Sequence, residues 1–241
     1  MKRILSVLLF VSLLLCLSGC SYDPPDGWTK KHHTYEEALA FAKSLDPNAT
    51  VSREYTDTVD ENDWQFRQWD AVINGVDCHV ASVSDWVWNE GLAAGEFVKV
   101  YYRMDTDYDY VVLQSILADQ YTNWQVEETL RNHYHHNTNT IFSELILPEN
   151  KMLSDDALAE IWQTALEINT AYTQQAIERK AGFSIPAPGE YYDQAKNEHF
   201  IKMDAHVCIE DFTEEGKVTF LQEYKEAWAL LESGLPIREA A

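Results

Sequence analysis

One carboxylate and one imidazole, Asp70 and His79, are brought opposite each other by a short turn in the sequence. The dipeptide Asn74-Gly75 is the preferred two-residue turn of a β-hairpin, and it has strand-like residues on both sides. Such a turn pairs Ile73 with Val76, and counting outward along both strands pairs Asp70 with His79. A carboxylate beside a histidine orients the ring and raises its basicity, as a general base or a metal ligand requires.

The Asp70–His79 pair is open to two interpretations, a catalytic pair or a cross-strand ion pair under solvent. Side chains alternate between the faces of a strand, so both residues lie on the face opposite the apolar one. No Gly-x-Ser-x-Gly, Ser-x-x-Lys or Cys-His motif accompanies them. The sequence therefore offers Asp70 and His79 as catalytic candidates without a nucleophile. The apolar face, which we expect to point into the core, carries Trp69, Ala71, Ile73, Val76, Cys78 and Val80.

A histidine-rich stretch offers a candidate metal site. Imidazole nitrogens are good ligands for zinc and copper, but His-Glu-x-x-His is absent, and this spacing needs a suitably folded loop to surround one ion. A polar loop is the alternative interpretation. The three candidate ligands are His133, His135 and His136.

A second candidate metal site resembles the start of an EF-hand calcium loop, with aspartates at alternate positions. The pattern then fails, because Tyr110 holds the glycine position and Ile116 the position of the bidentate glutamate. Weak calcium binding is the functional interpretation of this incomplete pattern, and no cofactor is expected for the protein. The three aspartates are Asp105, Asp107 and Asp109.

The first twenty residues have the order of an export signal. Lys2 and Arg3 precede an apolar run, Ile4 to Leu17, that is shorter than the about 20 residues needed to span a bilayer. The tetrapeptide Leu17-Ser18-Gly19-Cys20 then resembles the lipobox of bacterial lipoproteins. The resemblance implies removal of residues 1–19 and attachment of diacylglycerol, with acyl chains such as palmitate, to Cys20. An ordinary secretory signal and an uncleaved anchor are the alternatives.

The two cysteines that remain, Cys78 and Cys208, lie in strand-like sequence outside any Cys-x-x-Cys motif. In an exported chain they could form one disulfide. Buried free cysteine is also common, so the sequence leaves the two states open.

The charge balance limits the partners. Lysine and arginine number 18 against 40 aspartates and glutamates, for a net charge of −22 that loss of Lys2 and Arg3 would make more negative. Such a chain is repelled by nucleic acid and by anionic lipid headgroups, so neither is expected as a partner. With 46% hydrophobic residues, the chain has ample material for a packed core.

The element pattern predicts an α+β fold, with an antiparallel sheet that includes the Asn-Gly hairpin and three or more helices packed on it. Thr34 and Glu37 form a capping box for the first helix. A long helix of about 40 Å is expected to start after Ser154 and end near Gly182. Helices are also predicted at 108–119, 126–133 and after Thr213. Strands are predicted at 49–59, 97–104 and 141–147, one or two strands at 198–212, and a loop at 183–192.

Residues 20–32 are expected to form a tether, because Pro24-Pro25 and Gly27 favour extended chain. Residues 33–241 then form one α+β domain, or two subdomains divided near 148–154. The first helix and the hairpin together resemble the small helix-on-sheet modules of secreted bacterial proteins, such as the PepSY and cystatin-like groups.

These observations favour a lipid-anchored protein on the extracytoplasmic face of the cell membrane, acting as a non-catalytic binding or envelope-interaction module. Its expected partners are the membrane, through Cys20, and an extracellular ligand or envelope protein. An envelope hydrolase using Asp70 and His79 is the first alternative. A metal-binding lipoprotein using the His133 cluster is the second.

Overall fold

The computed structural model describes residues 26–60, 63–89, 97–126, 133–134 and 139–238. Over these residues the chain is α+β, as predicted, with four α-helices and ten strands arranged in two sheets. The predicted signal peptide and Cys20 lie outside the described residues, as does the start of the tether. Among the described residues, no helix combines the length and the apolar character needed to cross a bilayer.

The first sheet, sheet A, is antiparallel and contains the predicted hairpin. Strands β3 (Gln65–Ile73) and β4 (Val76–Asn89) pair in the predicted register, with Asp70 opposite His79. Positive φ angles of 49° at Asn74 and 78° at Gly75 make the tight connection. The remaining strands are β1 (Thr50–Val51), β2 (Thr56–Val59) and β5 (Phe97–Thr106), in the order β1-β3-β4-β5 with β2 also on β3.

Helix α2 (Tyr35–Leu45) covers the apolar face of sheet A. Its capping box is confirmed, because Thr34 accepts a hydrogen bond from the Glu37 amide while the Glu37 side chain reaches back to the Thr34 amide. Ala38 and Ala42 are fully buried in the same core as Trp69 and Cys78. The opposite face carries a smaller buried cluster, formed by Trp64, Phe66, Ala81, Val83 and Tyr134.

The second sheet, sheet B, is mixed rather than antiparallel. Its order is β10-β9-β8-β7-β6, and the pairs β7–β8 and β9–β10 are parallel. The strands are β6 (Trp124–Val126), β7 (Thr140–Leu145), β8 (Lys180–Asp193), β9 (Glu198–Ile209) and β10 (Ile237–Arg238). Strand β8 returns parallel to β7 because helix α5 (Asp155–Thr173) connects them, and such a crossover joins parallel strands. Sheet A is thus the predicted antiparallel sheet, and sheet B is a second, mixed sheet beside it.

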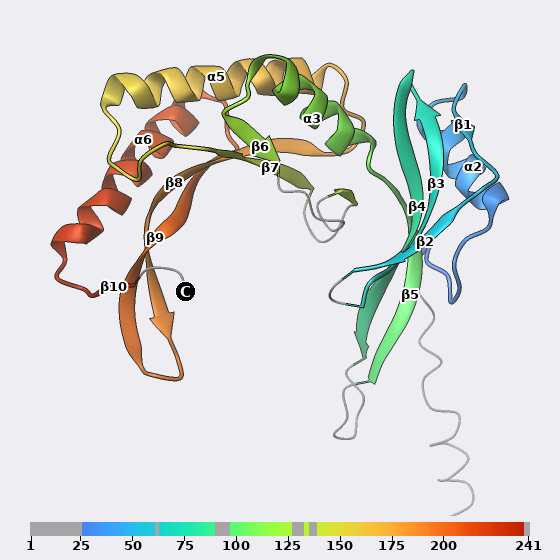
Figure 1. Cartoon of the computed structure of the whole chain (residues 1–241), viewed down its shortest axis with the longest axis horizontal. Coiled ribbons are helices and arrows are strands. Elements are labelled where there is room, and N and C mark those ends of the chain that lie inside the picture. Colours follow the sequence, from blue (N-terminus) through green and yellow to red (C-terminus); the bar gives the residue numbers. More distant parts are fainter. Residues whose placement is uncertain (1–25, 61–62, 90–96, 127–132, 135–138, 239–241) are drawn as a thin grey trace, which may run out of the picture.

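The helices tie the two sheets together. Helix α3 (Tyr108–Gln120) follows β5 directly, and α6 (Glu214–Ala229), with a final turn η1 (Leu230–Glu232), packs on β8 and β9. Figure 1 shows α3 and α5 running across the top, while the β8–β9 hairpin and the β4–β5 end of sheet A both extend away from them, toward the same side.

Two predictions about element length were wrong. The long helix stops at Thr173, after 19 residues or about 28 Å, because the backbone of 177–179 is held by a side chain of α3 instead of continuing the helix. The predicted loop at 183–192 belongs to β8. Its prolines, Pro186 and Pro188, are tolerated because β7 pairs with β8 only as far as Ser184 and leaves that edge open.

Candidate functional site

A buried carboxylate at the end of β5 holds His79. The pairing of β5 with β4 begins only at Val80, and beyond it the His79 carbonyl accepts hydrogen bonds from the Thr106 hydroxyl and the Asp107 amide. Asp107 is the residue before α3. One of its carboxylate oxygens accepts the His79 amide at 2.6 Å, and the other lies 2.7 Å from Nδ1 of the ring. Asp107 therefore fixes the main chain and the orientation of the imidazole together.

The other ring nitrogen faces the residue that the sequence predicted. Nε2 of His79 lies 3.5 Å from Oδ1 of Asp70. The Asp70 side chain is 87% exposed and that of His79 is 44% exposed, whereas Asp107 is only 4% exposed. Sequence reasoning found the cross-strand partner and missed the buried one, because Asp107 comes from the far end of another strand and had been placed in the calcium pattern.

The two carboxylates change the acidity of the ring. The hydrogen bond to Asp107, and then the negative charges of Asp107 and Asp70, raise the pKa of His79 above 6.5, although partial burial opposes them. The imidazolium form therefore persists to higher pH than in a free histidine. His79 therefore lies between two carboxylates, one buried and one exposed, that both favour its protonated form.

A shallow groove of about 480 Å³ lies over this pair. It combines carboxylates with hydroxyl groups from the β1 edge, and is lined by Thr50, Ser52, Asp70, Ala71, Val72, Asp77, Cys78 and His79. Cys78 packs into the core, and burial raises the pKa of its thiol to about 12, so it is not a thiolate at neutral pH. The Ser52 hydroxyl accepts a hydrogen bond from the Glu54 amide at 3.1 Å. The groove can therefore hold a polar ligand, but among the described residues that line it none is an activated nucleophile.

The three aspartates of the calcium pattern take separate partners. Asp105 pairs with Arg103, Asp107 holds His79, and Asp109 accepts the backbone amides of residues 177, 178 and 179 at 2.7–2.9 Å. Across the described part of the chain, no three His, Cys, Asp or Glu side chains are grouped as a metal site requires.

The histidine stretch is described only in part. The ring of His133 lies 4.0 Å from that of Tyr110, centroid to centroid, and the His133 carbonyl accepts a hydrogen bond from Arg179 at 3.3 Å. His135 and His136 lie outside the described residues.

The disulfide that the sequence left open is not formed. Cys78 and Cys208 are both free thiols, and they lie in different sheets, Cys78 buried in β4 and Cys208 exposed on β9.

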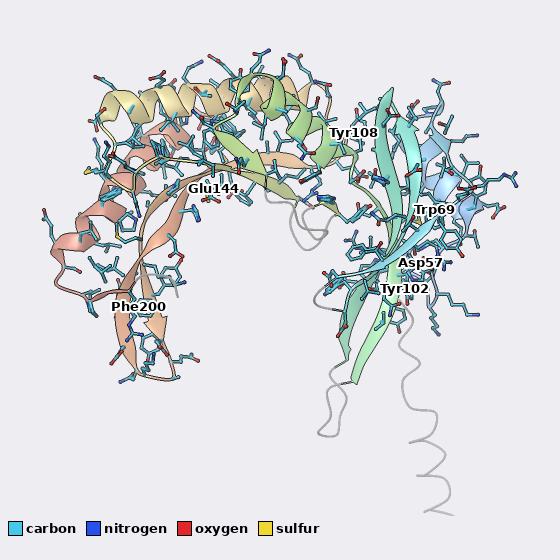
Figure 2. All side chains as sticks on the ribbon, viewed as in Figure 1. Asp57, Trp69, Tyr102, Tyr108, Glu144 and Phe200 are labelled. Atoms are coloured by element: carbon cyan, nitrogen blue, oxygen red, sulfur yellow. The ribbon has the colours of Figure 1, made fainter. Side chains whose placement is uncertain are left out.

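A segment expected to be tether is attached to sheet A. Thr29 exchanges two backbone hydrogen bonds with Tyr102 of β5, at 2.8 and 2.9 Å. The His32 ring packs against Tyr102 at 4.1 Å, and His33 makes contacts of 2.9 and 3.0 Å with the Ser82 hydroxyl (Figure 2 labels Tyr102). We call residues Thr29–His33 the N-terminal strap. No turn or periodic signal in the sequence marks it, because its partners come from β4 and β5.

Comparison with protein-family models, with curated proteins and with solved structures gave no match.

Proposed function

We propose that this protein is a lipoprotein, anchored through Cys20 on the extracytoplasmic face of the membrane, whose domain binds a ligand without transforming it. The export signal and the Leu17-Ser18-Gly19-Cys20 lipobox support the anchor. The proposed ligand site is the groove over His79. The single observation that carries it is the position of this ring between a buried and an open carboxylate, in a groove without an activated nucleophile.

The charges of the groove favour a cationic ligand, such as a primary ammonium group. Even when His79 is protonated, Asp70, Asp77 and Asp107 leave the groove negative. The hydroxyls of Thr50 and Ser52 add acceptors at the rim. The strongly negative chain also concentrates cations near its surface.

The two alternatives from the sequence have less support. A hydrolase would use Asp107 to orient His79, but it would need a nucleophile, and the Cys78 thiol is buried with a raised pKa. Among the candidate metal ligands of the histidine stretch, only His133 is among the described residues, where its ring packs against Tyr110.

Titration with 1,5-diaminopentane tests the ligand site. In the purified full chain, in neutral detergent micelles, the diamine should shift the His79 ring signals in NMR spectra and reach saturation. Asp70→Asn should weaken binding about three-fold, since an exposed ion pair is worth under about 1 kcal/mol. Asp204→Asn removes the same charge from an exposed site on β9 and should leave binding unchanged. Equal loss in both variants, or no saturable shift, would contradict the proposal.

Labelling with a palmitate analogue tests the anchor separately. The chain expressed in bacteria should incorporate the label, and Cys20→Ser should abolish incorporation. Cys16→Ser is the matched control, because this cysteine lies inside the predicted signal peptide and should not affect labelling. An unlabelled chain, or labelling that survives Cys20→Ser, would refute lipidation at Cys20.

A further inference from the structure

The end of the β8–β9 hairpin projects beyond the rest of sheet B. Strand β7 pairs with β8 only up to Ser184, and β10 pairs with β9 only at Ile201 and Lys202. The strands continue past these partners to Asp193 and Glu198, which pair with each other at the far end. Figure 1 shows this hairpin extending away from α3 and α5, toward the same side as the β4–β5 end of sheet A. We call residues 189–202 the distal hairpin.

Aromatic rings cover both faces of the distal hairpin. Tyr191 pairs across the strands with Phe200, and their rings stack at 6.1 Å (Figure 2 labels Phe200). The next pair, Tyr192 and His199, has its rings 4.8 Å apart. Because adjacent residues point to opposite faces, the two ring pairs lie on opposite sides. Tyr191 is 42% exposed and Tyr192 is 48% exposed, so both faces present tyrosine to the surroundings.

The distal hairpin and the adjacent Arg238 of β10 together carry no net charge. Cations lie over its rings, with Lys202 5.1 Å from the Tyr191 ring centre and Arg238 4.8 Å from that of Phe200. Arg238 also pairs with Glu198 and Asp193. Within residues 189–202 the acids are Glu190, Asp193 and Glu198 and the bases are Lys196 and Lys202. Arg238, on the adjacent β10, balances the third acid, in a chain of net charge −22.

We infer that the distal hairpin inserts its tyrosines into the headgroup region of the bilayer to which the chain is anchored. This inference rests on the proposed lipid anchor. Tyrosine is enriched at membrane interfaces, where its ring is buried and its hydroxyl stays wet. A bilayer surrounds an inserted hairpin on both faces, whereas a flat protein surface or a stacked sugar ring would meet only one. The balanced charge removes the repulsion that the rest of the chain would experience.

The attachment point of the chain keeps the domain near the lipid. The nine Cα–Cα steps from Cys20 to Thr29 span at most about 30 Å when extended. Thr29 is bound to Tyr102 of β5 by two backbone hydrogen bonds, so the segment that links the lipid to the domain ends at sheet A. The β4–β5 end of sheet A and the distal hairpin point the same way, so one surface can meet both.

A fluorescent probe at residue 192 tests the contact in the full, lipidated chain. The background carries Cys208→Ser, because Cys208 is exposed whereas Cys78 is buried. An environment-sensitive dye is attached to Tyr192→Cys, or to Glu160→Cys on the exposed side of α5 as the control. The protein is reconstituted in phosphatidylcholine vesicles with brominated acyl chains. The dye at 192 should shift to the blue and lose at least half of its emission, while the dye at 160 should change little.

Equal emission at the two positions in a chain that carries the lipid would overturn the inference and leave the proposed function intact. Failure of palmitate labelling would instead refute the anchor on which both depend. Adding Tyr191→Ser to the probe at 192 should reduce the quenching toward the value at 160. Quenching that is unchanged by Tyr191→Ser would show that tyrosine insertion does not hold the hairpin, and would also overturn the inference.

Discussion

At the scale of single residues, Asp107 controls the protonation of His79. It contacts both the amide and Nδ1 of that residue from a nearly buried position. A histidine whose pKa is raised by folding contributes stability that is complete below 6.5 and is lost as the pH rises through the folded-state pKa. The contribution of His79 to the free energy of unfolding is therefore largest when its ring is protonated.

Asp107→Asn should lower the pKa of His79 toward 6.5, because both the strongest hydrogen bond and the nearest charge to the ring lose their anionic character. NMR titration of the ring signals measures this directly. Asp70→Asn should have a smaller effect, since Asp70 is exposed and 3.5 Å away. An unchanged pKa in Asp107→Asn, or a larger drop in Asp70→Asn, would contradict this assignment.

His33 should respond to pH in the opposite sense. Burial lowers its pKa below 6.5, against a smaller opposing effect of Glu37, because the charged ring is poorly solvated beside Ser82. As the pH falls below 6.5, the unfolded chain takes up the proton more readily, so the free energy of unfolding decreases. This loss is complete once the pH is below the folded-state pKa.

Urea unfolding at pH 7.5 and pH 5.5 tests this prediction. Between the two pH values the free energy of unfolding of His33→Gln should fall less, or rise more, than that of the wild-type chain. The variant has no ring to protonate at this position, and the opposing contribution of His79 is common to both chains. His199→Gln, at an exposed ring, is the matched control and should behave like the wild type. If the free energy of unfolding of His33→Gln changes with pH as much as that of the wild-type chain, protonation of His33 does not contribute to the change.

At the scale of elements, structure that depends on residues close together in the sequence could be predicted, and structure that depends on distant strands could not. The capping box of α2 and the Asn74-Gly75 turn depend on residues within a few positions, and both were confirmed. The extent of β8 could not be predicted, because the tolerance for Pro186 depends on where its neighbour β7 ends. The partnership of Asp107 with His79 was missed for the same reason, since it joins residues 28 positions apart.

The capping box makes α2 the element whose stability can be predicted most directly. Thr34→Ala should lower the free energy of unfolding by about 1 kcal/mol, because the Glu37 amide loses its side-chain acceptor. Urea unfolding followed by far-UV circular dichroism measures it. Thr34→Ser retains the hydroxyl and should recover most of the loss. A Thr34→Ala chain as stable as the wild type would show that the cap is dispensable.

At the scale of the whole molecule, Asp109 joins the two sheets. It lies in the first turn of α3, which follows sheet A, and it is 3% exposed. Its two oxygens accept the amides of Ile177, Glu178 and Arg179, just before β8 of sheet B begins. The Tyr108 hydroxyl adds a bond to the Gln175 carbonyl at 3.2 Å. The connection between α5 and β8 is thus held by the helix that leaves sheet A.

Asp109→Ala should therefore weaken the coupling between the sheets as well as the total stability. Removing the carboxylate leaves three backbone amides without this acceptor, and each buried donor left unsatisfied costs about 1–3 kcal/mol. The urea concentration at the midpoint of unfolding should decrease. The rate of amide hydrogen exchange should increase in β8 and β9 at a lower urea concentration than in β3 and β4. Asp156→Ala, at an exposed position in the first turn of α5, is the control. A uniform rise in exchange across both sheets would show that the molecule unfolds as one unit and that Asp109 adds stability without coupling.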